Sequence, residues 1–426
     1  MAVTADSGMV PTRPVWLDPE EQSFPTLDRD LSVEVAIIGG GITGVACARW
    51  LGELGAASVA VLESRTVAAG ASGRNAGFVM AVAPENFPAT ENAADVEVSR
   101  RIWEFTDQNQ RMIEAAIDEF GLDAEYRKLG SLGLAAHPEE WDWIRSSTEV
   151  ARACGLKVEL ADRVSLESEW LKRNYLGGAW YPDNAEMHPA KFVRGLARVL
   201  ADRGAHFFER SPVTALDWWS NPDYVDISCG THIVRAERVI VAANAYAATV
   251  LPDAGAHISP TRGQVLTTAP LDRIVAKCPV YANDGFQYWR QRPDGRVVLG
   301  GWRDLDFGAE VGLAENLNLT IQDRLTEVAE GLCGGEVPIE YRWSGIMGFT
   351  KDRRPLVGRL PGESKVAICA GFSGHGLAMA MHSARVAVDD LLDRPTHWTD
   401  LFAPGRFLSS QLSEASAAEP STMRWF

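Results

Sequence analysis

Residues 33–44, VEVAIIGGGITG, run from an apolar strand through three glycines into the start of a helix. Val59–Glu63 is typical of a second buried strand. The helix expected between them, from Thr43 to about Gly55, therefore completes a strand–helix–strand unit. This order predicts a Rossmann-type α/β domain, in which a dinucleotide binds at the turn after the first strand.

Gly39, Gly41 and Gly44 have the GxGxxG spacing of dinucleotide-binding turns. The first glycine allows the tight turn, the second lets the backbone approach a pyrophosphate, and the third allows close helix–strand packing. The helix N-terminus offers free N–H groups to the phosphates. Glu63 ends the second strand about 20 residues further on, where an acid accepts hydrogen bonds from ribose hydroxyls. A carboxylate there disfavours a 2′-phosphate, so the dinucleotide is not expected to be NADP.

Further strand–helix–strand units are expected in the middle and at the end of the chain, with antiparallel segments between them. The expected helices are 92–120, 138–155, 189–204, 313–332 and a last one ending near 392, and the expected strands are 205–209, 238–243 and 366–370, with a hairpin across 213–235 and antiparallel strands within 258–303. Trp16 is expected to anchor an irregular N-terminal arm, and the tail beyond residue 407 is expected to fray.

Composition and charge exclude several classes of function. The chain has 426 residues and a formal net charge of −16, which disfavours nucleic-acid partners because phosphates need basic patches. It has no apolar run long enough to span a membrane and no secretory signal in residues 1–30, so a cytoplasmic enzyme is expected. The six cysteines lack the spacing of a zinc site or a disulfide framework, so reduced thiols and no metal are expected.

Several motifs together resemble the FAD-dependent amine and amino-acid oxidoreductases of the D-amino-acid oxidase superfamily. They are most similar to those of gamma-glutamylputrescine oxidase-like members. The motifs are GGGITG (39–44), GASGRNAGF (70–78), PTRGQVL (260–266), GRVVLGG (295–301), WSGIMGFTKDRRPLVGRL (343–360) and AGFSGHGL (370–377). The resemblance covers residues from about 33 to 392.

The resemblance implies an α/β Rossmann-type FAD-binding domain with an inserted α+β substrate domain built on an antiparallel sheet, as in glutathione-reductase-like folds of the D-amino-acid oxidase type. The expected FAD-binding domain comprises 1–85, 155–248 and 338–426. The expected substrate domain comprises 86–154 and 249–337.

The resemblance also implies specific contacts to a noncovalent FAD. Ile42 and Thr43 are expected at the pyrophosphate, Glu63 at the ribose and Val213 at the adenine. A Gly/Ser/Arg loop is expected along the pyrophosphate and isoalloxazine, through Ala71, Ser72, Arg74, Asn75, Ala76 and Gly77. The amides that open the last helix, at Gly374, His375, Gly376 and Leu377, are expected to face the flavin pyrimidine. Met347 and Gly348 lie where sarcosine oxidases attach FAD through cysteine, so no covalent link is expected.

On the substrate side, His375, Trp343, Met347 and Tyr288 are the candidate catalytic residues. The candidate cavity walls are Phe78, Gln287, Tyr288, Arg290, Trp302 and Trp343. Met347 stands where glycine oxidase-like relatives have an arginine that binds the substrate α-carboxylate. A thioether cannot form the two parallel hydrogen bonds that a guanidinium donates to a carboxylate. The expected substrate is therefore an amine without that carboxylate, or a carboxylate bound by Arg290, Arg262 or Arg342 instead.

The sequence thus favours FAD-dependent oxidation of an amine C–N bond, giving an imine that hydrolyses to an aldehyde. The nearest alternative is an N-substituted amino acid or iminodicarboxylate as substrate. An NAD-dependent dehydrogenase, or a flavin-binding protein without turnover, is also compatible with the glycine turn and its acid. Sarcosine oxidases have a lysine that helps oxygen react with the flavin, and Val298 stands at that position here. The sequence therefore leaves two electron acceptors possible, oxygen or another molecule.

Overall fold

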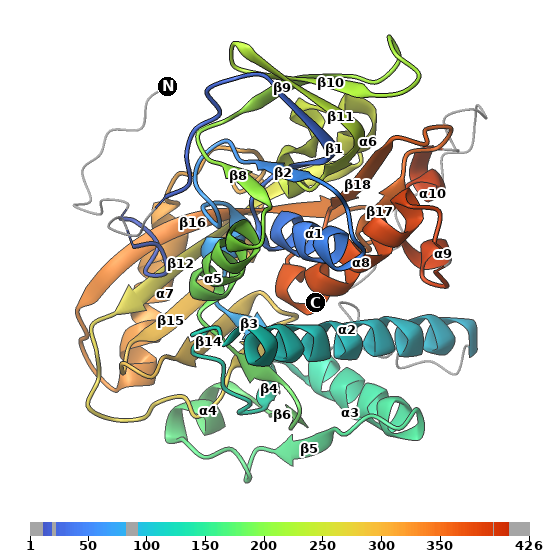
Figure 1. Cartoon of the computed structure of the whole chain (residues 1–426). Coiled ribbons are helices and arrows are strands. Elements are labelled where there is room, and N and C mark those ends of the chain that lie inside the picture. Colours follow the sequence, from blue (N-terminus) through green and yellow to red (C-terminus); the bar gives the residue numbers. More distant parts are fainter. Residues whose placement is uncertain (1–11, 19–22, 82–92, 395, 409–426) are drawn as a thin grey trace.

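The computed structural model describes residues 12–18, 23–81, 93–394 and 396–408. They form two eight-stranded sheets with helices packed around them (Figure 1). In sequence order the chain passes from the first sheet to the second and back again twice. The tail expected to fray lies largely outside the described residues, which end at 408.

The first sheet has the parallel centre of a Rossmann-type domain. Its strand order is β17-β18-β11-β1-β2-β8. The bounds are β1 (Leu31–Ile38), β2 (Val59–Leu62), β8 (His206–Phe208), β11 (His232–Val241), β17 (Leu356–Arg359) and β18 (Val366–Ala370). All neighbouring pairs on this path are parallel except β17 with β18. The continuous burial of β18 and of the last four residues of β1 fits strands covered by helices on both faces.

The expected hairpin and the expected strand after it are joined in the structure. β9 (Val213–Asp217) and β10 (Val225–Cys229) run antiparallel to one another, and β10 pairs with β11. The prediction of a separate strand beginning at residue 238 is wrong, because β11 runs unbroken from His232. The first half of β11 alternates between buried and exposed residues, and its last three residues are all buried, so the two halves look different in sequence.

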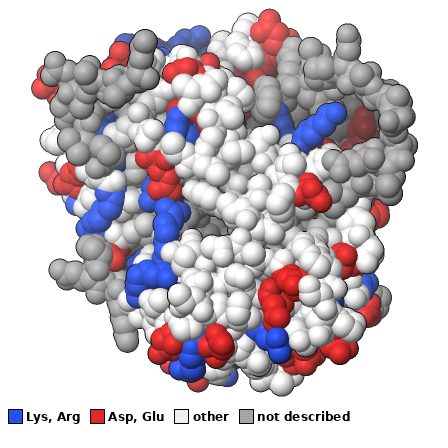
Figure 2. Space-filling view, turned by 90° about the horizontal axis from the view of Figure 1, so that it is seen from above, with Lys and Arg blue, Asp and Glu red and all other residues white. Residues whose placement is uncertain are grey.

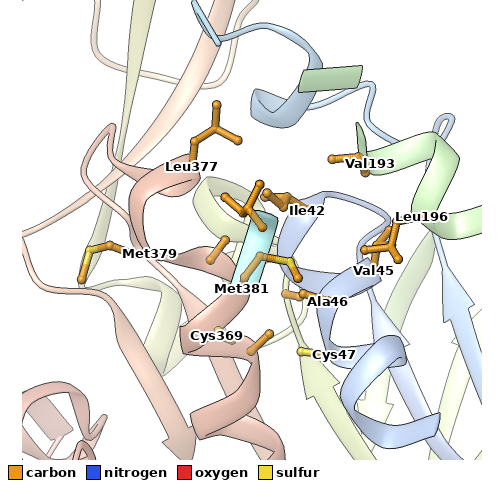
Figure 3. Packing of buried hydrophobic residues seen from close by; sticks show 14 of the residues in the cluster. Ile42, Val45, Ala46, Cys47, Val193, Leu196, Cys369, Leu377, Met379 and Met381 are labelled. Atoms are coloured by element: carbon orange, nitrogen blue, oxygen red, sulfur yellow. The ribbon is translucent and has the colours of Figure 1, made fainter. Parts of the chain in front are cut away.

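The helices α1 (Ile42–Glu53), α5 (Pro189–Asp202) and α8 (Gly376–Leu391) pack together on the first sheet. Figure 3 shows the contact: small and apolar residues of α1 meet those of α8 and α5. The labelled residues are Ile42, Val45, Ala46, Cys47, Val193, Leu196, Cys369, Leu377, Met379 and Met381. α2 (Ala93–Phe120) lies against α8 as well. This packing fixes the starts of α1 and α8 next to each other.

The second sheet is antiparallel except where β4 pairs with β13. Its order is β16-β12-β15-β14-β13-β4-β6-β5. The bounds are β4 (Ser131–Ala135), β5 (Glu159–Asp162), β6 (Gly177–Tyr181), β12 (Ile258–Thr268), β13 (Val280–Ala282), β14 (Gln287–Gln291), β15 (Val297–Gly301) and β16 (Ile339–Thr350). The helices α3 (Pro138–Ala153), α4 (Glu169–Asn174) and α7 (Leu319–Cys333) belong to this half.

The strand pairing differs from the expected domain division in two places. β5 and β6 lie within 155–248 and β16 within 338–426, yet all three pair in the second sheet. β6 can join because Gly178 packs against β4, where an added Cβ would lie 2.3 Å from the Gly133 carbonyl oxygen. The first sheet therefore takes its strands only from residues 31–62, 206–241 and 356–370.

α7 begins later than expected. The prediction placed its start at residue 313, but Asn318 is the N-cap and its side chain accepts a hydrogen bond from the Ile321 amide at 3.4 Å. Residues 307–318 are instead a loop between η3 (Arg303–Asp306) and α7. Through Glu315 this loop contacts the segment that follows β2 of the first sheet.

The N-terminal arm packs through Trp16, as expected. Trp16 is 2% exposed, and its indole N–H donates to the Asn75 carbonyl at 2.7 Å. The six cysteines are all unpaired, as predicted.

Among the described residues, no helix combines the length and the apolar character needed to cross a bilayer. On the face in Figure 2, basic and acidic side chains are interspersed around a broad uncharged centre.

Candidate active site

A cavity of about 730 Å³ lies between the two sheets. One side is formed by the carboxyl ends of β1 and β2 and by the residues that follow β11 and β18. The other side is formed by strands of the second sheet, including β4, β12, β13 and β14. Ligands of open parallel sheets bind at the carboxyl ends of the strands, so this is where the fold predicts a nucleotide.

The GxGxxG turn has the geometry that its glycines require. Gly39 has φ +111°, and an added Cβ would lie 2.7 Å from the Ala242 carbonyl oxygen. A Cβ on Gly44 would lie 1.9 Å from the Gly39 carbonyl oxygen, so Gly44 serves helix–strand packing and does not line the cavity. Gly41 borders the cavity and is the N-cap of α1 without a side-chain cap. The Ile42 amide at the start of α1 donates to the Ser72 hydroxyl at 2.9 Å, and the other amides of the first turn face the cavity, where an anion can bind.

Glu63 is held at the end of β2 by backbone amides. Its Oε2 accepts from the Gly40 N–H and its Oε1 from the Arg65 N–H, both at 2.7 Å. The carboxylate lines the cavity next to the glycine turn. It is therefore oriented before any ligand arrives, with lone pairs left for hydroxyl groups.

In the loop after β2, the polar side chains bond largely to other protein groups, which fixes the conformation of the loop. Asn75 donates to the Ala71 and Ser72 carbonyls and accepts from the Gly77 amide. Arg74 donates to the Ser344 carbonyl at 2.9 Å and forms an ion pair with Glu315 at 3.0 Å. The loop residues still line the cavity, so their backbone forms a wall and their side chains fix it.

The start of α8 faces the same cavity. Gly374 has φ +89°, and His375 is the N-cap without a side-chain cap. The His375 Nδ1 lies 3.0 Å from the Ser373 carbonyl oxygen. Burial lowers the pKa of His375 to about 4, so its ring is neutral at neutral pH. A neutral ring adds no charge of its own to the positive end of the helix dipole.

All but two of the residues expected at the cofactor line this cavity; the exceptions are Gly44 and Gly348. Gly348 packs against β12 and the residues after β11, where an added Cβ would lie 2.7 Å from Ile258 and 3.0 Å from the Asn244 side chain. Its carbonyl accepts from the Ser373 amide at 2.7 Å. Gly348 therefore supports the turn before α8 from the side that faces away from the cavity.

Of the candidate catalytic residues, His375, Met347 and Tyr288 line the cavity and Trp343 does not. Trp343 is 1% exposed, and its indole N–H donates to the Arg74 carbonyl at 3.0 Å. It therefore braces the loop after β2. Gln287 and Trp302 are likewise absent from the walls, whereas Phe78 is part of them.

None of the three arginines expected to bind a carboxylate lines the cavity. Arg290 is buried in an ion pair with Glu186 at 3.0 Å and donates to the Ala76 carbonyl. Arg262 pairs with Glu310, and Arg342 donates to the Gln322 side chain. These expectations are wrong because each guanidinium meets a partner that is distant in sequence.

Sequence reasoning missed two groups of cavity residues. The first group is Arg65 and Glu315. Glu315 pairs with Arg65 at 2.8 Å and with the predicted Arg74 at 3.0 Å, so the 307–318 loop is tied across the cavity edge. Tyr281 and Arg303 line the side formed by the second sheet. The signal for Arg303 is its place two residues after the GRVVLGG motif, which ends at Gly301.

Two helix starts and a positioned carboxylate around one cavity are the features of a dinucleotide-binding site. The model of the family described as FAD dependent oxidoreductase matches residues 34–389. The chain therefore belongs to this family.

Individual relatives are similar along most of their length. Gamma-glutamylputrescine oxidoreductase of Escherichia coli (strain K12) is 28% identical over 389 residues, covering 89% of this chain and 88% of the relative. The crystal structure of glycine oxidase from Geobacillus kaustophilus has a TM-score of 0.75 at 20% identity, covering 88% and 99% of the two chains. The structure of L-proline dehydrogenase from P. horikoshii has a TM-score of 0.74 at 21% identity, covering 89% and 99%.

The cofactor of this family is FAD, and the cavity fits it. Its volume falls in the range of about 300–1,000 Å³ typical of small-molecule and cofactor sites. The uncapped starts of α1 and α8 both border it, and a Cβ on Gly41 would come within 3.0 Å of the Ser72 hydroxyl. Glu63 and Val213 lie on the walls where the nucleoside is expected.

Proposed function

We propose that the protein oxidises the C–N bond of an amine with FAD, giving an imine that hydrolyses to an aldehyde. The observation that carries this proposal is one cavity that joins the starts of α1 and α8 to aromatic walls from the second sheet. The E. coli relative, a gamma-glutamylputrescine oxidoreductase, supports an amine as substrate. Bound FAD would supply the hydride acceptor, flavin N5.

The residues around the expected flavin pyrimidine would orient the amine and exclude water. Met347 of β16 lies beside the turn before α8, where an added Cβ on Gly374 would be 3.4 Å from its sulfur. Phe349 and Tyr288 add apolar surface nearby. Because His375 is neutral, no imidazolium opposes an amine there. We further propose that FAD is held without a cysteinyl link, since none of the six cysteines, all within the described residues, lines the cavity.

The second candidate substrate is an N-substituted amino acid or iminodicarboxylate. Its carboxylate would need a cation in the cavity, and Arg303 lines the side formed by the second sheet. The structural similarity to a proline dehydrogenase supports this alternative, because proline is a secondary amine with a carboxylate.

The proposal is tested by purifying the protein and mixing it, without oxygen, with a panel of amines and N-alkyl amino acids. We expect a yellow protein whose flavin absorbance is bleached by at least one amine. A colourless protein that binds NAD would contradict the proposal. A yellow protein that only dithionite bleaches would contradict it as well.

Admitting air after bleaching then identifies the electron acceptor. Rapid recolouring with formation of peroxide would indicate an oxidase. Slow recolouring would indicate a dehydrogenase that passes electrons to another acceptor.

A further inference from the structure

Arg303 is a buried cation in the cavity wall whose surroundings indicate that it binds a ligand. It follows β15 at the start of η3, after Trp302, which has the left-handed φ of +55° and turns the chain. Arg303 is 7% exposed and lines the cavity. Its guanidinium lies over the ring of Phe286, 4.4 Å from the centroid, and over that of Phe349 at 5.4 Å.

Arg303 has no protein anion to balance its charge. Within the described part of the chain, its guanidinium has no hydrogen bond or ion pair, and its Nε is buried without a partner. The adjacent Asp304 instead accepts from the Asn283 side chain at 3.2 Å. Arg290 is as deeply buried but has Glu186 and two carbonyls as partners. An unpaired buried cation costs several kcal/mol, so Arg303 differs from the structural arginines around it.

Two tyrosines and a second arginine, Arg353, lie close enough to Arg303 to interact with its charge. Tyr281 and Tyr288 line the cavity with ring centroids 5.9 Å apart. Neither hydroxyl has a hydrogen bond to another described residue. Burial raises the pKa of Tyr288 to about 12, against the opposing effect of Arg303, so its hydroxyl remains a donor. The guanidinium of Arg303 and two phenolic donors match a carboxylate, which accepts paired hydrogen bonds from arginine and further ones from hydroxyl groups.

We propose that Arg303, with the hydroxyls of Tyr281 and Tyr288, binds a carboxylate of the amine substrate. This inference rests on the proposed function and deepens it. The substrate class becomes an amine that bears a carboxylate held at η3, at a different place from the arginine position that Met347 occupies. Arg303 then determines specificity for the charge of the substrate.

The test uses the FAD-loaded protein and two probes of equal shape, butyrate and its uncharged analogue butyramide. Each probe is titrated while the visible absorption spectrum of the bound flavin is recorded. Arg303→Met is expected to raise the dissociation constant of butyrate by about 10- to 100-fold, the value of a charge-assisted hydrogen-bonded pair, and to leave that of butyramide nearly unchanged. Arg303→Lys is expected to give a butyrate dissociation constant between those of Arg303→Met and the unaltered protein, because an ammonium group keeps the charge but cannot donate two parallel hydrogen bonds.

Arg324→Met is the matched control, because Arg324 is an arginine half-exposed on α7 that pairs with Glu327. It removes one positive charge outside the cavity and should bind butyrate like the unaltered protein. Tyr288→Phe should weaken butyrate binding by about threefold to tenfold, as expected for one hydroxyl donor.

The proposal is overturned if the unaltered protein binds butyrate no better than butyramide, or if Arg303→Met weakens both probes equally. It is also overturned if Arg303→Met and Arg303→Lys lose FAD while their remaining holoprotein still prefers butyrate, since Arg303 would then serve the cofactor. A protein that binds butyrate through Arg303 but is bleached by no amine would contradict the proposed function alone.

Discussion

Gly44 is the residue at which a single methyl group should disturb the fold most clearly. A Cβ there would overlap the Gly39 carbonyl oxygen at 1.9 Å, in the turn that joins β1 to α1. Because backbone on both sides is fixed by the sheet and by α8, the turn cannot relax without moving the cavity wall. We expect Gly44→Ala to lower the free energy of unfolding by about 3 kcal/mol or more, measured by urea denaturation.

The same helix offers the control. Gly52 is exposed in the last turn of α1, and a Cβ there meets nothing within 4 Å. Gly52→Ala should therefore raise the free energy of unfolding by about 0.5–1 kcal/mol through helix propensity alone. Equal effects of the two substitutions would contradict the role assigned to Gly44.

Individual residues differ in how far the sequence identifies them. Glu63 was predictable, because its position relative to the glycines is fixed by one local strand–helix–strand unit. Arg290 lies within β14 and Arg303 two residues after the neighbouring β15, and nothing in the local sequence shows which of the two has a protein partner. What separates them is Glu186, a partner for Arg290 that lies 104 positions before it in the chain (290 − 186).

The loop at 307–318 should act as a clamp on the cofactor. Glu315 in this loop pairs with Arg65 and Arg74, and its side chain is 25% exposed. Glu315→Gln would remove both ion pairs while keeping the shape of the side chain. We expect FAD to dissociate about three- to tenfold faster, as followed by the recovery of flavin fluorescence after dilution.

Glu327→Gln is the control for this clamp, because Glu327 forms an exposed ion pair with Arg324 within α7. Its FAD dissociation rate should match that of the unaltered protein. High salt should narrow the difference between Glu315→Gln and the unaltered protein, because screening weakens the ion pairs. A salt-independent difference would argue against an electrostatic clamp.

Among the elements, local signals predicted α1, α3 and α5 within two residues at most ends, since each has a clear start and stop. β16 was not predicted, although it is a 12-residue strand. Its sequence, IEYRWSGIMGFT, does not alternate, and its pairing partner β12 lies far away in the chain. β5 and β6 were not predicted either, and their residues fall in the segment 155–248 expected in the FAD-binding domain, although they pair in the second sheet. The pairing of β6 with β4, more than 40 residues earlier, leaves no local signal.

The whole molecule should lose stability in mild acid through His382. This residue of α8 stacks on Phe105 of α2 with ring centroids 4.0 Å apart, and its Nδ1 lies 3.1 Å from the Phe105 carbonyl oxygen. Burial lowers the pKa of His382 to about 4, whereas a free histidine titrates near 6.5. Between these values the unfolded chain binds a proton that the folded protein excludes, so acid favours unfolding.

The expected loss is roughly 3 kcal/mol at most as the pH falls through this window. Unfolding free energies measured across it should therefore fall less steeply for His382→Gln than for the unaltered protein. His206→Gln, at an exposed position at the start of β8, is the control and should keep the full slope. Identical slopes for all three proteins would show that His382 is not the responsible group.

The alternation of the chain between the two sheets has a consequence for biosynthesis. The ribosome delivers the start of α1 early, but β18 and the residues that open α8 emerge only near the end of translation. Until then, Val239–Val241 of β11 can pair with β1 on one side but lacks its parallel neighbour β18 on the other. We therefore expect FAD to bind only after nearly the whole polypeptide has been synthesised. Before that point, the nascent chain exposes an unpaired strand edge of the kind that chaperones bind.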